Sequence, residues 1–172
     1  MQKEFSYPLI VAEIPQKEQH YHIIADEKQK KSLAHILKIP EVRELKADFN
    51  LKSDYKTSLL YINGHISSAL VLQSVITLEN FSKNYDFDFE LVFDTRATLD
   101  TQKEEGKEWD DNTPEIVIGG MIDLGDIAVE QIALRLDDYP RQDGEEFNFK
   151  SEFDDNDIKK ENPFAVLASL KK

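Results

Sequence analysis

Apolar and polar residues alternate one by one along three stretches of the chain, which is the pattern of half-buried β-strands. The clearest of these stretches runs from Phe81 to Phe93. One face carries Phe81, Tyr85, Phe87, Phe89, Leu91 and Phe93, and the opposite face carries Asn84, Asp86, Asp88, Glu90 and Asp94. This stretch is therefore predicted to be a strand with an aromatic core side and an acidic solvent side.

The same period of two residues occurs twice earlier in the chain. Apolar residues alternate with charged or amide residues from Leu45 to Leu51. In the segment that begins at Leu60, the even-numbered positions are apolar or small: Ile62, Gly64, Ile66, Ser68, Leu70, Leu72 and Ile76. Asn63-Gly64 is a suitable hairpin turn. The unbroken even-numbered face instead favours one long strand bent at Gly64.

Two segments have the spacing of amphipathic helices. Asp26 is a suitable N-cap for a helix over residues 27–38, and Pro40 ends the run. The side chains expected to face inward are Leu33, Ile36 and Leu37. Asp123 similarly caps a helix that extends to about Leu136. Its apolar positions are Leu124, Ala128, Val129, Ile132, Ala133 and Leu136.

These elements, with short strands over Phe5–Val11 and Tyr21–Ala25, predict an α+β fold. We expect a curved, mainly antiparallel, barrel-like β-sheet packed with two helices. Residues 95–113 and 139–161 are polar and charged with few apolar side chains, so both segments are predicted to be unstructured. The chain is accordingly divided into a folded domain over residues 1–138, an acidic flexible linker over 139–161 and a helical motif over 162–172.

The last segment combines a helix start with an apolar face. Asparagine is a good N-cap and proline suits the first turn, so Asn162-Pro163 is predicted to open a short helix that ends near Leu170. A chain terminus normally frays and tolerates polar residues, so an apolar helix here is predicted to dock onto a partner. The candidate partner-binding residues are Asn162, Pro163, Phe164, Val166, Leu167, Leu170 and Lys171. Packing of this helix onto the chain's own core remains open as the alternative.

The charge of the chain is large and unevenly distributed. The chain has 172 residues and a formal net charge of −13. Residues 1–83 hold 11 basic and 10 acidic residues, whereas residues 84–160 hold 8 basic and 23 acidic residues. An acidic half repels phosphate backbones and attracts basic protein surfaces. A role in solubility alone explains the same charge and also stays open.

The expected location is the cytoplasm. The N-terminal residues lack the apolar stretch of a signal peptide, and no apolar run is long enough for a transmembrane helix. The chain contains no cysteine, which excludes disulfide bonds and thiolate metal sites and suits a reducing compartment.

The residues that could carry catalysis or metal binding are few. His20 and His22 share one side of a strand, but no third metal ligand is suggested, so they are read as surface histidines. Asp123 and Asp126 are read as a helix cap and a first-turn acid. Gly119-Gly120 lacks the lysine and hydroxyl of a phosphate-binding loop. We therefore expect no enzyme activity, no metal, no cofactor and no small-molecule ligand.

Direct binding of RNA is the alternative function. The aromatic side of Phe81–Phe93 could stack bases, but the neighbouring side chains are acids, so a core role is favoured. The helix after Asp26 carries the one basic patch, and any RNA contact is expected at Lys28, Lys30, Lys31 and Lys38. A solvated helix face accounts for the same lysines.

Three segments together resemble the YceD family, the large ribosomal RNA subunit accumulation proteins. They are the sequence Val71–Phe81 leading into the aromatic strand, Ile122–Pro140, and Asn162–Lys172. In some members Cys-x-x-Cys occupies the place of Ser74–Thr77, and serine and threonine are not zinc ligands, so metal binding is not carried over. The resemblance implies a cytoplasmic, non-catalytic factor in accumulation and processing of large-subunit (23S) ribosomal RNA, and hence in ribosome biogenesis. The expected partner is a ribosome assembly intermediate or a basic ribosomal or assembly protein.

Overall fold

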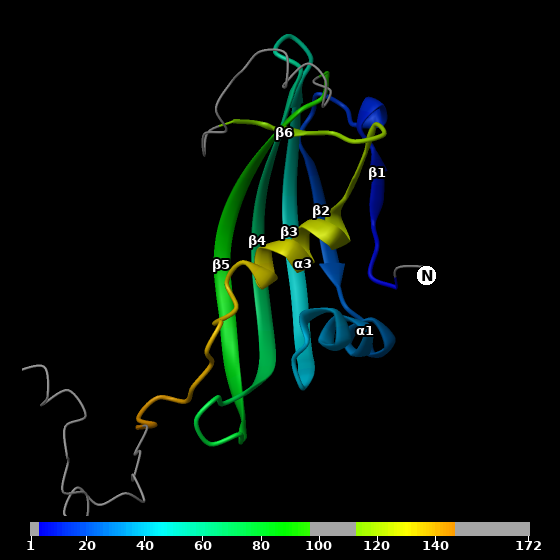
Figure 1. The fold of residues 1–172 in the computed structure, drawn as a ribbon. Helices are drawn as coiled ribbons and strands as arrows, with labels where there is room; N and C mark the ends of the chain where they lie inside the picture. Colours follow the sequence, from blue (N-terminus) through cyan, green and yellow to red (C-terminus); the bar gives the residue numbers. More distant parts are fainter. Residues whose placement is uncertain (1–3, 97–112, 147–172) are drawn as a thin grey trace, which may run out of the picture.

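A computed structural model describes residues 4–96 and 113–146, and its centre is an antiparallel meander of three long strands (Figure 1). These strands are β3 (Glu41–Asp54), β4 (Leu59–Gln73) and β5 (Asn80–Asp94). β3 and β4 alternate buried with less buried residues along much of their length, and β5 alternates partly buried with exposed residues, with the period that the sequence predicts. Asn63 and Gly64 lie inside β4, so the interpretation of one long strand is confirmed over the hairpin.

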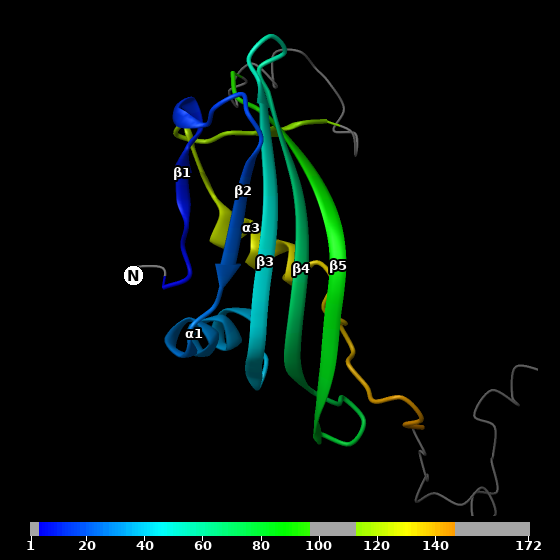
Figure 2. The ribbon, with the colours of Figure 1, turned by 180° about the vertical axis from the view of Figure 1, so that it is seen from behind.

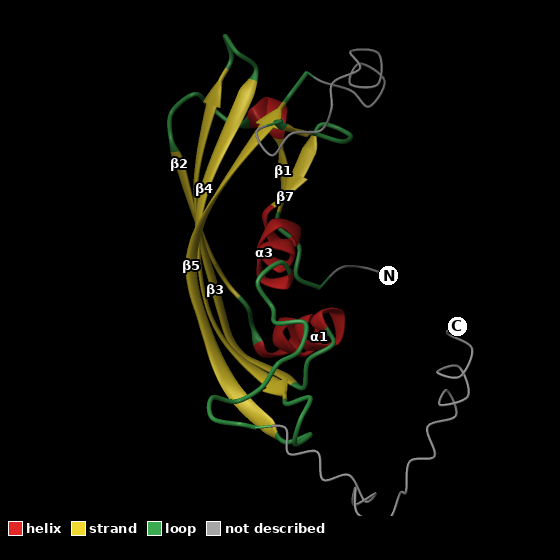
Figure 3. Cartoon of the chain, turned by 60° about the vertical axis from the view of Figure 1, so that its left-hand side comes forward, coloured by secondary structure: helices red, strands yellow, loops and turns green. Residues whose placement is uncertain are grey.

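Two shorter strands complete a five-stranded sheet in the order β2-β3-β4-β5-β6. β2 (Gln19–Ile24) pairs antiparallel with β3, and β6 (Glu115–Ile116) pairs parallel with the end of β5. The sheet is curved, as expected, but the barrel-like closure is wrong: within the described residues the sheet is open (Figure 3). Its two outer strands have six and two residues, which is too little edge to join the sheet into a barrel.

Both helices lie on the concave side of the sheet, which confirms the α+β class (Figure 3). Helix α1 (Glu27–Leu37) begins with a capping box: the Asp26 carboxylate accepts the backbone N–H groups of Lys28 and Gln29, and the Gln29 amide oxygen accepts the Asp26 N–H. The predicted inward position of Ile36 is wrong, since 53% of this residue is exposed. Ile36 instead lines a groove that the following elements leave open.

The second helix, α3 (Leu124–Ala133), begins at Asp123 as predicted and ends three residues before Leu136. It is preceded by β7 (Met121–Asp123), which pairs with β1 (Pro8–Ile10) in a separate two-stranded sheet. A single 3₁₀ turn, η1 (Val11–Glu13), follows β1.

The core lies between the concave face of the sheet and the two helices. Its fully buried large side chains include Leu33, Leu45, Phe49, Leu51, Leu60, Ile62, Ile66, Leu70, Leu124 and Ile132. Phe49 and Phe89 meet edge to face with ring centroids 5.9 Å apart. Gly64, between them in the register, leaves the space that the Phe89 ring fills, because a Cβ atom there would lie 2.0 Å from the ring. The glycine thus permits the close contact between β4 and β5.

Candidate functional site

The convex face of the five-stranded sheet carries rows of histidine and acidic side chains. Figure 2 views the sheet from this side, with α3 behind it. The strand register aligns His22 with Asp48, Asp48 with His65, and His65 with Asp88 across four strands. In the part of the chain that the structure describes, no helix covers this face (Figure 3). The arrangement leaves a charged surface open to a partner.

Two histidines of this face, His22 and His65, pair with the carboxylates beside them. His22 Nδ1 lies 2.5 Å from an oxygen of Asp48, and His65 Nδ1 lies 2.8 Å from an oxygen of Asp88. The other ring nitrogen of His65 lies 3.7 Å from Asp86. The hydrogen bond to Asp88, together with the negative charges of Asp86, Asp88 and Asp48, raises the pKa of His65 above its usual value. A lower pH therefore protonates His65 and reduces the net negative charge of this face.

The structure places His20 and His22 on the exposed convex face, as the sequence suggests. His20 pairs with the Asn50 side chain, and His22 pairs with Asp48. Among residues 4–96 and 113–146, no group of three or more histidine, aspartate or glutamate side chains is arranged to hold a metal ion. The chemistry that this face offers is ion pairing and hydrogen bonding.

The four lysines considered for RNA contact have different surroundings. Lys28 forms an ion pair of 3.0 Å with Glu4. Lys30 pairs with Glu27 at 2.5 Å, and only 16% of its side chain is exposed. Lys31 is exposed on α1, and Lys38 lies at the C-cap of this helix in a left-handed conformation. The helix thus brings the four lysines onto one element, but two of them are already paired with acids.

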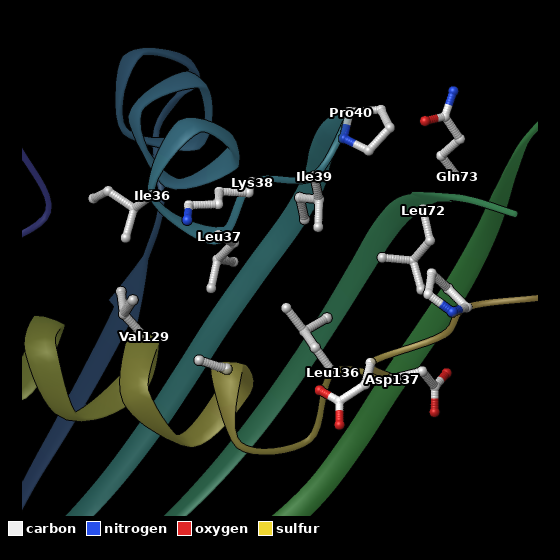
Figure 4. Close-up of a pocket in the computed structure, with 13 residues that line it drawn as sticks. Ile36, Leu37, Lys38, Ile39, Pro40, Leu72, Gln73, Val129, Leu136 and Asp137 are labelled. Atoms are coloured by element: carbon white, nitrogen blue, oxygen red, sulfur yellow. The ribbon is translucent and has the colours of Figure 1, made fainter. Parts of the chain in front are cut away.

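A groove of about 680 Å³ lies between the end of α1, the end of β4 and the end of α3 (Figure 4). Its aliphatic lining includes Ile36, Leu37, Ile39, Leu72, Val129, Ala133 and Leu136. Asp137, Asp138 and Lys38 also line it. Small-molecule sites usually add several convergent polar groups to an apolar wall. This groove combines an aliphatic wall with charged side chains in its lining.

The turn between β4 and β5 is held by a carboxylate. The hydroxyl groups of Ser74 and Thr77 both donate to Glu145, the latter over 3.1 Å. The Val75 N–H donates to the Pro140 carbonyl over 2.9 Å. Residues 139–146 are the only part of the predicted linker among the described residues, and these bonds attach them to the turn. No local sequence pattern indicates this contact, because its partners are about 70 residues apart.

Asp123 has the structural role that was predicted for it. Its carboxylate accepts the backbone N–H groups of Gly125 and Asp126 and also binds Ser6 and the Tyr7 N–H. Burial alone would raise the pKa of this carboxyl, but the four hydrogen bonds outweigh it and lower the pKa. Through these hydrogen bonds the carboxylate fixes the segment before β1 to the start of α3.

The remaining candidate residues, Asn162 to Lys171, lie outside the described residues. Among the described helices, none has the length and apolar character needed to cross a lipid bilayer.

Over residues 4–96 and 113–146, the fold and surfaces define an α+β protein with an open sheet, one face of which is charged and carries no helix (Figure 3). The sequence model of one family, described as large ribosomal RNA subunit accumulation protein YceD, matches residues 62–171. The chain belongs to the YceD family, in agreement with the resemblance noted from the sequence. The family description names a role in RNA accumulation and no enzymatic activity. Comparisons with curated proteins and with solved structures found no match.

Proposed function

We propose that this protein is a cytoplasmic, non-catalytic ribosome-biogenesis factor that supports the accumulation and processing of large-subunit (23S) ribosomal RNA. It acts by binding a protein or ribonucleoprotein partner, namely a ribosome assembly intermediate or a basic ribosomal or assembly protein. Membership in the YceD family supports the biological role. The observation that supports the mode of action is the uncovered convex face with Asp48, Asp86, Asp88 and Glu90.

The charge of this face favours a basic protein over naked RNA. Carboxylates repel phosphate groups, whereas lysine and arginine side chains of a partner gain both attraction and faster encounter. The alternative, direct RNA binding through α1, has less support because Lys28 and Lys30 are paired with acids. RNA bound through several lysines would also be released steeply by salt.

Capture from a cell extract tests the proposal. The full-length chain, immobilised at one end, is incubated with extract that has or has not been treated with RNase. We expect large-subunit assembly proteins to be captured in both samples. Two results together would instead establish direct RNA binding through α1. Capture would disappear after RNase treatment, and tight binding of purified ribosomal RNA would be lost when Lys28, Lys30 and Lys31 become glutamate.

The C-terminal segment supplies a second proposed contact. Phe164, Leu167 and Leu170 are spaced so that they share one face of a helix, and Lys171 adds a positive charge. We propose that this segment docks onto the partner. Deletion of residues 162–172 is expected to leave the melting temperature of the folded domain unchanged and to lower the level of mature large-subunit RNA in cells. Normal RNA levels in the deletion variant would exclude the docking role, and a variant that fails to fold would indicate packing onto the chain's own core.

A further inference from the structure

The two edges of β5 differ in how completely they are paired. Along its inner edge, every residue from Asn80 to Asp94 has a partner in β4. Along its outer edge, β6 pairs only with Phe93 and Asp94. Near the other end, Lys83 forms an ion pair with Asp137. Between these points, in the part of the chain that the structure describes, the section from Asp86 to Val92 has no neighbouring strand on its outer side (Figure 1).

Three hydrogen bonds show which backbone groups of β5 point outward. The Asp94 carbonyl accepts the N–H of Val117, which lies beyond β6, and the Asp88 carbonyl accepts the Arg135 guanidinium over 3.4 Å. The Thr95 N–H, by contrast, points inward to Ser58. Successive residues of a strand direct their backbone groups to opposite edges. The N–H and C=O groups of Asp86, Asp88 and Glu90 therefore face the open side.

The side chains beside this open edge are acidic on the convex side and apolar on the concave side. On the convex side, Asp86, Asp88 and Glu90 are exposed. On the concave side, Phe87 and Leu91 are only partly buried, since no strand lies beside them. The Arg135 guanidinium lies 3.9 Å from the centre of the Phe87 ring. The Arg135 guanidinium of this same chain thus already lies against this edge, where it contacts the Phe87 ring and the Asp88 carbonyl.

We propose that the Asp86–Val92 edge of β5 receives an extended segment of the partner protein, in which lysine or arginine alternates with apolar residues. Such a segment adds a strand to the sheet through backbone hydrogen bonds. Its basic side chains lie beside Asp86, Asp88 and Glu90, and its apolar side chains lie beside Leu91. At Asp88 a backbone N–H of the added strand takes the place of the Arg135 guanidinium on the carbonyl, which also uncovers the Phe87 ring. The inference rests on the proposed function in that the partner is a protein.

The same charges exclude the other simple occupant, a second copy of this chain. Edge-to-edge pairing of two β5 strands would bring the two acidic rows together, and like charges opposite one another destabilise a sheet. Exposed edges of natural sheets are commonly protected by charged side chains in this way. The acidic row therefore disfavours edge-to-edge pairing of two β5 strands and favours a basic strand.

A peptide probe tests the edge directly on the full chain. Two blocked peptides of identical composition are compared: one alternates lysine and valine, and the other has its lysines in one block and its valines in another. The alternating peptide is expected to slow hydrogen exchange at the amides of Asp86, Asp88 and Glu90 and to bind about tenfold more tightly, because only it can pair both faces at once. Equal binding of the two peptides, or protection elsewhere than at these amides, would overturn the proposal.

A matched pair of variants separates backbone pairing from charge. Glu90→Pro removes an outward N–H that β4 does not use, and proline is tolerated on edge strands. Glu90→Gln removes the charge and keeps the N–H. Glu90→Pro is expected to abolish protection of the edge, whereas Glu90→Gln weakens the peptide only a few-fold. The exchange pattern of the wild-type chain decides the question even if the proline variant does not fold.

Capture from extract relates this result to the proposed function. Capture by the wild-type chain and loss in Glu90→Pro supports both proposals. Equal capture by both chains overturns the edge and leaves the proposed function intact. Absence of capture by either chain contradicts the proposed function, and with it the class of partner on which the edge proposal rests.

Discussion

The two faces of the long sheet have opposite characters although they are formed by the same three strands. The concave face is apolar, closely packed and covered by α1 and α3 (Figure 3). The convex face carries ion pairs between histidines and carboxylates and is uncovered in the described structure. In β3, β4 and β5, alternate residues point to opposite faces of the sheet. The residues on the concave face stabilise the fold, and those on the convex face remain available for contact with a partner.

Truncation of a large concave side chain should have the largest effect on stability. Phe49 is 1% exposed and contacts Phe89, so Phe49→Ala is expected to lower the free energy of unfolding by about 3–5 kcal/mol. The matched convex change in the same strand, Lys52→Ala, is expected to alter it by no more than about 0.5 kcal/mol. Urea unfolding measures both. Similar losses of unfolding free energy in the two variants would contradict the conclusion that the concave face contributes more to stability than the convex face.

The close contact at Gly64 gives the next largest effect. A methyl group at this position meets the Phe89 ring, so Gly64→Ala is expected to cost about 1–3 kcal/mol through overpacking. Phe89→Leu in the same chain should restore part of that loss, because a smaller side chain leaves room for the methyl group. A double-mutant cycle measures the coupling, and strictly additive losses would argue against a direct contact.

The hydrogen bonds of the β4–β5 turn should contribute an amount of similar size. Ser74 is fully buried, and its hydroxyl binds Glu145 and accepts the N–H groups of Ile76 and Thr77. Ser74→Ala is expected to destabilise the protein by about 1–3 kcal/mol and to speed hydrogen exchange at the Val75 amide. Ser67→Ala, on the convex face of β4, is the control and should change neither measurement.

The smallest effect is a pH dependence of the convex face. Asp88, Asp86 and Asp48 raise the pKa of His65 in the folded protein. The stabilisation is therefore fully present below the usual histidine pKa of about 6.5 and is lost as the pH rises through the raised value. The wild-type melting temperature is expected to fall slightly across this range relative to that of His65→Gln. The side chain is 42% exposed, so added salt should reduce the difference.

The sequence was sufficient for the elements whose pattern is local. Alternation predicted β5 with its aromatic and acidic sides, and Asp26 and Asp123 marked the starts of both helices. Closure of the sheet was not predictable, because it depends on how much strand the short outer elements contribute. The exposure of Ile36 was missed for a related reason, since helical spacing cannot show where a neighbouring helix ends.

The candidate surfaces were predictable only in part. The acidic side of β5 is visible in the sequence, but the alignment of His22, Asp48, His65 and Asp88 depends on strand order and register. The attachment of Glu145 to the β4–β5 turn joins distant parts of the chain, and no local pattern indicates it. The open outer edge of β5 follows from the shortness of β6, which only the folded chain reveals.

The contact between Gly64 and Phe89 also constrains the order in which the sequence can evolve. A lineage that keeps the Phe89 ring cannot acquire any side chain at position 64 without a clash. A smaller residue at position 89 removes that clash, so a side chain at position 64 costs less stability when the change at position 89 comes first. The reverse change is affected in the same way. Once a side chain is present at position 64, a return to phenylalanine at position 89 creates the clash and lowers stability. The cost of a substitution at either of these two core positions therefore depends on which position changes first.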